Sequence, residues 1–348
     1  MEQHDVTQIR SVDHRESNSS PGVTRGAPLA VGSRIGNFQV ERILGIGGFG
    51  IVYLAVQDVT GRYVAIKEYF PSAMLERVGA YDVRLKSAED QELFMMGMRS
   101  FVKEATLLSS LNHEGLVQVL HFWEEHGTAY MVMPYYEGQS LSRYLGQKDC
   151  TITTDFILNI LAKLLPTLAY LHDRNIFHRD ISPDNIFLLT NGDPVLLDFG
   201  AARHIVDKAE NVTVILKSGY APIEQYDEHG EQGAWTDIYA VGGVLYHAMT
   251  GKVPVQAISR MMNDPLKPVA AAARGTYSEN LCAVVMKCLA VMPENRYQSV
   301  DELRAALGWV TTPVSSTVIL QRTTYANAAD SAAANLARSA AVAPATPV

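Results

Sequence analysis

The order of apolar and polar positions predicts strands in the first half of the chain, after an arm without periodicity. Residues 1–35 are rich in Ser, Gly and Arg and are typical of a disordered segment. From Phe38 onward, short runs of apolar or alternating residues indicate strands. We predict strands over 38–44, 51–54, 64–67, 116–120 and 129–133, and one helix over 101–108, where positions 101, 105 and 108 are apolar.

The pattern of the second half is mainly helical. A broad apolar stripe over 155–174 predicts a long helix, and it consists of Ile157, Ile160, Leu161, Leu164, Leu165, Leu168 and Leu171. Asn191-Gly192 separates two short apolar runs and predicts a β-hairpin. We expect further helices from Asp237 to Gly251 and within 278–308. The segment 309–348 is dominated by Ala, Thr, Ser and Pro and is typical of a low-complexity tail.

Composition excludes several classes of protein. A hydrophobic content of 47% is ample for a core, and the formal net charge of −8 argues against a nucleic-acid binder. Only three cysteines occur, so the sequence predicts no disulfide framework and favours a reducing compartment. We find no apolar run of about 18 residues, the length that a membrane span needs. The default expectation is therefore a cytoplasmic protein without a membrane span.

A glycine-rich turn and a lysine-bearing strand follow one another near the start of the ordered region. The turn, Gly45-Ile46-Gly47-Gly48-Phe49-Gly50, leads into a strand, whereas the dinucleotide-binding loop of a Rossmann fold would lead into a helix. Glycines allow backbone N–H groups to approach phosphates without a Cβ in the way. A plain hairpin turn is the alternative, until Val64-Ala65-Ile66-Lys67 adds a cation nearby.

The second cluster of polar residues lies on a loop between apolar segments. His178-Arg179-Asp180 is followed five residues after Asp180 by Asn185, and Asp198-Phe199-Gly200 comes after the predicted hairpin. An Asp on such a loop can orient a hydroxyl nucleophile. Asn and Asp oxygens suit Mg²⁺, a hard cation that keeps several waters. The hairpin explains how Asn185 and Asp198 can reach one site.

In this order, the motifs resemble those of protein kinases, and the resemblance covers about residues 36–308. It is similar to bacterial serine/threonine kinases of the subgroup with I-K-E-Y-F-P and G-Y-A-P-I-E-Q-Y sequences. The resemblance implies an α+β, two-lobed kinase fold: a small lobe with an antiparallel sheet and one main helix over about 36–133, a hinge over 134–138, and a mainly helical large lobe over about 139–308. The role of the insert at 68–98 is left open: it is either a packed spacer or a docking surface.

The resemblance also implies the ligands and the residues that meet them. Lys67 is expected to contact the α- and β-phosphates of ATP and to pair with Glu104, because Glu68 is too close along the strand to turn back. Asp180 would handle the attacking hydroxyl, and Asn185 and Asp198 would bind Mg²⁺. The expected nucleotide site comprises Leu44, Gly45, Ile46, Gly47, Gly48, Phe49, Gly50, Val52, Ala65, Lys67, Met133, Pro134, Tyr136 and Phe187.

The segment from Asp198 to Glu224 resembles a kinase activation segment. Arg179, beside Asp180, resembles the arginine that binds a phosphorylated residue of this segment. The segment offers Thr213 and Ser218 as autophosphorylation sites, and Thr213 is preferred. A solvated loop residue is the alternative for Thr213. Glu224 is expected to form a buried ion pair with Arg296, and Asp237 to hold the backbone of the catalytic loop.

One position departs from the family pattern. Most serine/threonine kinases have Lys two residues after the catalytic Asp, where this chain has Ser182, and they have Thr where alignment on Tyr220 puts Lys217. The two residue types are thus exchanged. We predict that Lys217 reaches across the cleft and supplies the missing positive charge. The alternative is a slower or inactive enzyme.

The sequence therefore predicts an ATP- and Mg²⁺-dependent protein kinase that phosphorylates Ser and Thr of protein substrates and its own activation segment. A dimer in which one copy phosphorylates the other is one arrangement this allows.

The absent lysine weakens the choice of Ser/Thr over Tyr. A pseudokinase, a nucleotide-binding or scaffold module without turnover, is the alternative, and the retained Lys67, Asp180, Asn185 and Asp198 speak against it. Small-molecule phosphotransfer is disfavoured by the complete activation segment.

Overall fold

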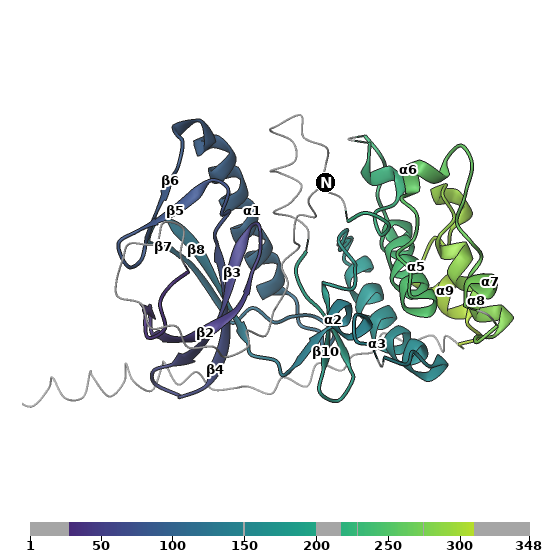
Figure 1. Ribbon diagram of the computed structural model, residues 1–348, viewed down its shortest axis with the longest axis horizontal. Helices are drawn as coiled ribbons and strands as arrows, with labels where there is room; N and C mark the ends of the chain where they lie inside the picture. The colour runs from purple at the N-terminus through teal and green to yellow at the C-terminus, as the bar shows by residue number, and fades with distance from the viewer. Residues whose placement is uncertain (1–27, 149, 200–216, 228, 274, 310–348) are drawn as a thin grey trace, which may run out of the picture. The chain divides into compact units, whose positions relative to one another are not determined.

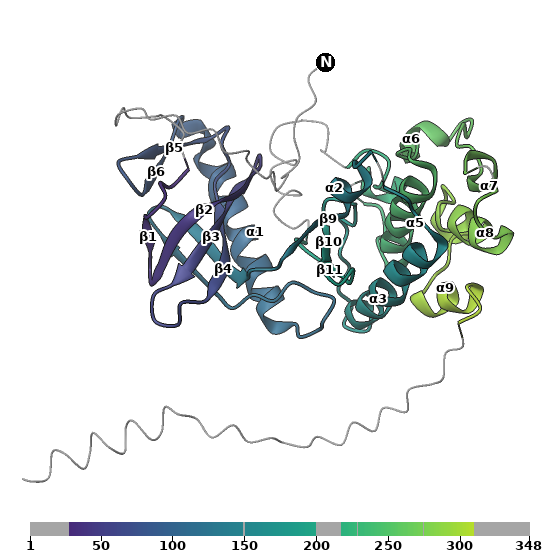
Figure 2. The same ribbon diagram turned by 60° about the horizontal axis from the view of Figure 1, so that its bottom comes forward.

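The computed structural model describes residues 28–148, 150–199, 217–227, 229–273 and 275–309. They form a small lobe built on a β-sheet and a large, mainly helical lobe (Figures 1 and 2). This arrangement confirms the predicted α+β, two-lobed fold. Thr213 and the two terminal segments lie outside the described residues.

An antiparallel sheet of six strands, in the order β1-β2-β3-β4-β8-β7, forms the small lobe. Its strands are β1 (Arg34–Ile35), β2 (Phe38–Ile46), β3 (Gly50–Gln57), β4 (Tyr63–Tyr69), β7 (His121–Glu125) and β8 (Thr128–Pro134). On β4, Lys67 pairs with Val52 and Met131 of the neighbouring strands. Because successive side chains of a strand alternate between faces, Lys67 and Glu68 lie on opposite sides of this sheet.

Helix α1 (Gln91–Ser110) packs against the sheet and begins ten residues before the predicted helix. Its early turns bury Leu93, Phe94 and Met98, so the last part of the predicted insert, residues 91–98, belongs to this helix. The predicted face at Phe101 is also buried. The apolar period simply continues toward the N-terminus.

The rest of the insert is a hairpin of β5 (Leu75–Val78) and β6 (Asp82–Leu85), followed by the short helix η1 (Ala88–Asp90). It is attached to the turn between β7 and β8, where Val83 N–H donates to the His126 carbonyl at 3.0 Å. The ring of Tyr81 stacks on His126 with centroids 5.1 Å apart. The insert is therefore a packed part of the small lobe.

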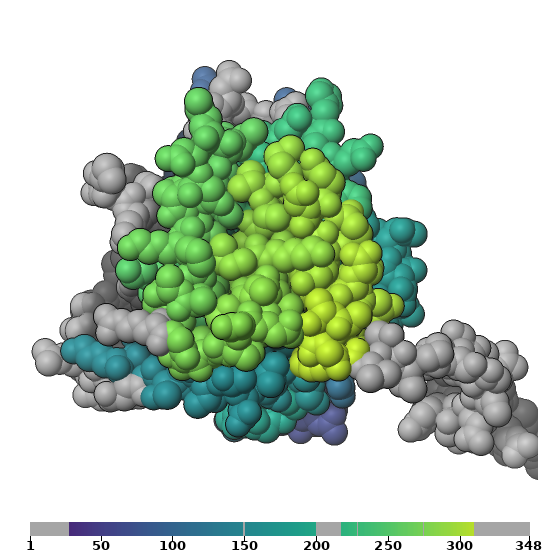
Figure 3. Space-filling model, turned by 90° about the vertical axis from the view of Figure 1, so that its right-hand side faces the viewer, coloured from purple at the N-terminus to yellow at the C-terminus, as the bar shows by residue number. Residues whose placement is uncertain are grey.

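Helices surround the core of the large lobe. They are α2 (Leu141–Leu145), α3 (Thr154–His172), α5 (Ala234–Thr250), α6 (Ala257–Arg260), α7 (Val269–Ala272), α8 (Glu279–Cys288) and α9 (Val300–Ala306), with the short η3 (Ile223–Gln225) and η4 (Pro293–Asn295). The buried α5 contacts α3, α7 and α8, and ends at Gly251 in the left-handed conformation, as predicted. The last described helices cover one face of this lobe, green to yellow in Figure 3.

Among the described helices, α3 alone is long and apolar enough to cross a membrane by length and composition. The predicted stripe of this helix, from Ile157 to Leu171, is buried inside the large lobe. Its apolar character is therefore explained by the core.

A small sheet in the order β11-β10-β9 lies beside the cleft. It consists of β9 (Gly138–Ser140), β10 (Ile186–Leu189) and β11 (Pro194–Leu196), the last two forming the predicted hairpin. The predicted strand at 116–120 is wrong, because the corresponding strand of the small lobe is β7, at 121–125. The run at 116–120 is apolar for another reason: Leu116 and Val117 are buried against Leu196 of the large lobe.

Candidate active site

A cleft of about 200 Å³ is lined by residues of both lobes. Most of the predicted nucleotide-binding residues line it: Leu44, Val52, Ala65, Lys67, Met133, Pro134, Tyr136 and Phe187. The predicted metal ligands Asn185 and Asp198 line it as well. The cleft thus joins an apolar end, suited to a flat ring, to a polar end.

The predicted glycine turn, residues 45–50, does not line this cleft. Among the described residues that line the cleft, none comes from Gly45, Ile46, Gly47, Gly48, Phe49 or Gly50. A Cβ on Gly50 would lie 2.6 Å from the Glu68 carbonyl oxygen, so glycine is required there by the close approach of β4. A Cβ on Gly48 would meet nothing within 4 Å. A phosphate-binding role of this turn stays a prediction.

Several lining residues were missed by the sequence reasoning: Arg42, Val117, Tyr135, Gly138, Arg143, Asp184 and Leu197. Arg42 precedes Leu44 by two positions on β2, and this period of two was the available signal. The Arg42 guanidinium donates to the Tyr135 hydroxyl at 3.3 Å. No sequence pattern indicated Arg143 as a lining residue, because its position depends on how α2 packs beside β10.

Lys67, Asp198 and Glu104 meet at the polar end of the cleft. Lys67 Nζ lies 2.7 Å from Asp198 Oδ1. The Glu104 side chain is buried on α1, and burial raises its pKa to about 8, although the charge of Lys67 opposes this shift. Oε1 of Glu104 has no hydrogen-bond partner in the described part of the chain. The cluster therefore contains a buried carboxyl whose bonding is incomplete.

Asp237 fixes the backbone of the catalytic loop, as predicted. Its Oδ2 accepts the backbone N–H of His178 at 2.9 Å, and its Oδ1 accepts that of Arg179 at 2.8 Å. Arg179 has φ +64°, a left-handed conformation that costs energy for a residue other than glycine. Gln225 also donates to the Arg179 carbonyl, at 2.7 Å. These bonds hold the strained turn just before Asp180.

Asn185 is oriented by Asp180. Its amide nitrogen donates to the Asp180 carbonyl at 2.8 Å and to Asp180 Oδ2 at 2.7 Å. The Asn185 carbonyl in turn accepts the Leu197 N–H at 2.8 Å, which ties the loop to the residue before Asp198. Because the amide nitrogen is engaged, the amide oxygen is the atom that this side chain offers to a ligand.

The structure brings Ser182 and Lys217 together, 35 residues apart in sequence. Lys217 Nζ donates to Ser182 Oγ at 2.6 Å and lies 3.4 Å from Asp180 Oδ2. Ser182 is fully buried, and the Lys217 side chain is only 7% exposed. An ammonium group therefore lies beside the predicted catalytic carboxylate, although the loop itself lacks the usual lysine.

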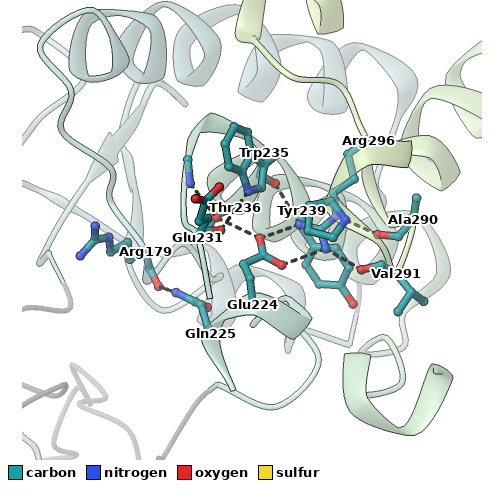
Figure 4. A network of polar contacts seen from close by, with 12 residues as sticks. Arg179, Glu224, Gln225, Glu231, Trp235, Thr236, Tyr239, Ala290, Val291 and Arg296 are labelled. Carbon is teal, nitrogen blue, oxygen red and sulfur yellow. Dashed lines mark hydrogen bonds and ion pairs between the residues drawn. The ribbon is translucent and has the colours of Figure 1, made fainter. Parts of the chain in front are cut away.

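The end of the activation segment is anchored by the predicted ion pair, shown in Figure 4. Arg296 forms two parallel bonds to Glu224, of 2.7 and 3.0 Å, and both side chains are buried. Thr236 donates a further bond to Glu224 at 2.9 Å. Arg296 also donates to the carbonyls of Ala290 and Val291. Each charge is thus compensated, as burial requires.

Two oxygen ligands are available for a metal. Among the described residues, no group of three or more His, Cys, Asp or Glu side chains is arranged to hold a metal ion. Asn185 and Asp198 nevertheless line the same cleft and offer amide and carboxylate oxygens. Mg²⁺ is commonly held by one or two such groups, with water and substrate phosphates completing its shell. The donor chemistry fits Mg²⁺ bound together with a nucleotide.

Comparisons with known proteins agree with this geometry. The family described as protein kinase domain matches residues 38–306. The serine/threonine-protein kinase PknB of Mycobacterium tuberculosis is 32% identical over 286 residues, which cover 78% of this chain and 42% of that protein. PrkC of Bacillus subtilis, also named a serine/threonine-protein kinase, is 29% identical over 284 residues, covering 80% and 41%. The chain therefore spans less than half the length of these relatives.

Solved structures give the same result for the fold. The apo form of PpkA-294 has a TM-score of 0.77 and 39% sequence identity, and the match covers 80% of this chain and 99% of that one. The kinase domain of Mycobacterium tuberculosis PknI matches 81% of this chain and all of its own, with a TM-score of 0.58. Its identity is 24%, so it supports the fold alone.

Proposed function

This chain belongs to the protein kinase family, in its serine/threonine branch, and from that premise we propose that it transfers the γ-phosphoryl group of ATP to Ser and Thr hydroxyls of proteins. The observation that carries the proposal is that Lys67, Asn185 and Asp198 line one cleft, with Asp180 bonded directly to Asn185. Its apolar end would take the adenine ring. Phosphoryl transfer needs little beyond such positioning and charge compensation.

Asp180 is the group that receives the hydroxyl proton. In the proposed step the substrate oxygen forms a bond to the γ-phosphorus while the bond to the β,γ-bridging oxygen breaks, and ADP leaves. Asn185 holds the Asp180 carboxylate in place for this role by donating to its Oδ2, and it also donates to the Asp180 backbone carbonyl. Lys67 binds the α- and β-phosphates. Glu104, whose Oε1 has no partner among the described residues, is available to receive Lys67 when a nucleotide draws it away from Asp198.

Magnesium, when bound, neutralises charge on the β- and γ-phosphates. Asn185 and Asp198 are the side chains that would hold it, since their oxygens line the same cleft. The glycine turn at 45–50 would cover the phosphates. Supporting this, the turn lies at the junction of β2 and β3, directly beside the strand that carries Lys67.

The pseudokinase alternative has less support. A module without turnover has no need of a catalytic Asp, yet Asp180 is present and is held by two bonds from Asn185 and by the Asp237-supported loop. For partners, the proposal is protein substrates, and a second copy of the chain for phosphorylation of Thr213 in trans. The free cysteines Cys150, Cys282 and Cys288 support a reducing compartment, and we propose the cytoplasm, where ATP is available.

The test is incubation of the protein with Mg²⁺ and ATP labelled at the γ-phosphate, beside Asp180→Ala. We expect labelled protein from the unaltered chain and a loss of at least ~10²-fold in the variant, because general-base positioning contributes factors of that size. Asp173→Ala, an exposed Asp at the end of α3, is the matched control and keeps full labelling. Phosphoamino-acid analysis then separates Ser and Thr from Tyr. ATP binding without any Asp180-dependent labelling would support the pseudokinase instead.

A further inference from the structure

The position of Lys217 has a consequence beyond the proposed function, on which this inference rests. Within the catalytic loop, Ser182 has a hydroxyl but no charge, and it is fully buried. The ammonium beside it comes from Lys217, 35 residues further along the chain, at the end of the activation segment. Lys217 Nζ is within 3.4 Å of Asp180 Oδ2, the carboxylate at which the hydroxyl proton is received.

The backbone around Lys217 is fixed by its own contacts. Its carbonyl accepts the N–H groups of Tyr220 at 2.9 Å and Ala221 at 3.2 Å. Gly219 has φ +89°, and a Cβ there would lie 2.6 Å from the Pro254 carbonyl oxygen. Ser218 accepts a bond from Gln256 at 2.6 Å. The segment 217–221 is thus docked on the large lobe, with the lysine side chain directed toward the catalytic loop.

Burial of an ammonium group is costly unless the surroundings use its charge. Lys217 is 7% exposed, and one nearby carboxylate belongs to Asp180, which is itself 13% exposed. A tether between two loops needs only a hydrogen bond, which a neutral side chain could supply. The Asp180 carboxylate balances this charge in part, and a cation at this place would also stabilise the negative charge that develops on a transferring phosphoryl group and its leaving oxygen.

We propose that Lys217 is a catalytic residue that contacts the transferring phosphoryl group, in place of a lysine on the catalytic loop. It forms no covalent bond and keeps its proton, while Asp180 takes the proton of the hydroxyl. The charge is therefore carried by the activation segment. It is in place only when residues 217–221 are docked, which couples the order of this segment directly to the rate of transfer.

The test is a set of variants assayed for kcat and for KM of ATP. Lys217→Gln keeps a donor of similar length but removes the charge. We expect its kcat to fall by ~10²–10³-fold, the usual effect of losing one transition-state donor, with KM for ATP changed less than threefold. Lys252→Gln is the matched control, an exposed lysine beside the same docking site, and keeps the kcat of the unaltered chain. A Lys217→Gln enzyme of unaltered kcat would show that Lys217 is only a tether, and would overturn the proposal.

The exchange Ser182→Lys with Lys217→Thr gives the second arm. Ser182→Lys alone places two cations together in a buried site and is expected to lower both kcat and the melting temperature. Combined with Lys217→Thr, it returns one cation to the site, and we expect kcat at least tenfold above that of Lys217→Thr. A folded double variant without this recovery overturns the proposal.

A third arm covers the case in which the double variant does not fold. Lys217→Arg keeps the charge and Lys217→Met removes it, so kcat of the Arg variant is expected to exceed that of the Met variant at least tenfold. Equal values overturn the proposal. If the unaltered chain transfers no phosphate at all, the proposed function fails and this inference fails with it. Activity that is indifferent to these variants removes the inference alone.

Discussion

Lys67 and Glu68 are neighbours on β4 and lie on opposite faces of the sheet. The buried carboxyl group on each face differs in how many hydrogen bonds it makes. Glu68 is fully buried, and its carboxylate accepts bonds from Tyr53 and Arg77 at 2.7 Å and from Tyr130 at 3.1 Å. Lys67, on the cleft face, lies beside a buried Glu104 whose Oε1 has no partner among the described residues. On one face the buried carboxylate of Glu68 has all its bonds made, and on the other the bonding of the buried Glu104 carboxyl group is incomplete.

This difference in bonding suggests that the Glu68 face of the sheet serves the stability of the fold and the Lys67 face serves its function. A buried charge with all its bonds made resists rearrangement, because any motion exposes an unpaired ion. Arg77 comes from the hairpin of the insert, so the insert supplies the counter-ion of the small lobe's buried carboxylate. At the cleft, an incomplete set of bonds would let the side chains exchange partners on binding of the proposed nucleotide. Substitutions on the two faces of β4 should therefore differ in their effects on the free energy of unfolding.

The largest effect is expected from Arg77→Met. The change leaves the Glu68 carboxylate buried without its counter-ion, and such losses cost about 3–5 kcal/mol. Denaturant unfolding of both proteins measures the difference. Arg84→Met is the control on the same hairpin: Arg84 pairs with Glu76 but is 67% exposed, so we expect a loss below ~1 kcal/mol. Equal losses in the two variants would contradict a special role of the buried pair.

The second prediction concerns Glu104 and pH. Its pKa is raised from 4.5 to about 8, mainly by burial, so the folded protein binds the carboxyl proton more tightly than the unfolded chain does. The stability from this group is fully present below pH 4.5 and is lost as pH rises toward 8, by up to ~1.4 kcal/mol per pH unit.

Glu104→Gln tests this, because glutamine stays neutral throughout. We expect the stability of the variant, relative to the unaltered protein, to increase from pH 5 to pH 8 in urea unfolding. Glu92→Gln, at an exposed position on the same helix, serves as the control and shows no such trend. Parallel curves for Glu104→Gln and the unaltered protein would mean that the carboxyl ionises normally in the fold.

Two other carboxylates, those of Glu224 and Asp237, show where prediction from the sequence succeeded. Long-range pairs with a motif at each end were accessible: Glu224 with Arg296, and Asp237 with the catalytic loop, are joined in the structure as expected. The strand that carries Lys67 was likewise accessible, since its apolar pattern and the preceding glycine turn indicate the same hairpin.

Other features depend on contacts that no local pattern records. Glu68 and Arg77 are only nine residues apart, but their meeting requires the hairpin β5–β6 to dock on the sheet. In the run at 116–120, Leu116 and Val117 are apolar because they are buried against Leu196 of β11, and a strand pattern cannot distinguish this from pairing within the sheet of the small lobe. Arg143 reaches the cleft through the packing of α2, which the alternation of residues does not reveal.

A smaller effect is expected from Tyr53→Phe. The hydroxyl donates to Glu68 at 2.7 Å and accepts the Leu29 N–H at 3.1 Å, so its removal takes one bond from the carboxylate and one from the backbone. Loss of a buried bond of this kind costs about 1–3 kcal/mol. Tyr63→Phe is the control, because Tyr63 is 58% exposed. A melting temperature equal to that of the control would show that Arg77 and Tyr130 suffice for Glu68.

The smallest change in stability is expected from Lys67→Met, on the other face of the same strand. The pair with Asp198 is partly open to solvent, with 31% of the Asp198 side chain exposed, so its loss changes the free energy of unfolding by less than ~1 kcal/mol. Activity should nevertheless fall at least ~10²-fold, because a cation at the phosphates is lost. Thermal unfolding and labelled-ATP assays on one preparation give both values. If Lys67→Met destabilised the fold as much as Arg77→Met, both faces of β4 would be structural, and the incomplete bonding of Glu104 would need another explanation.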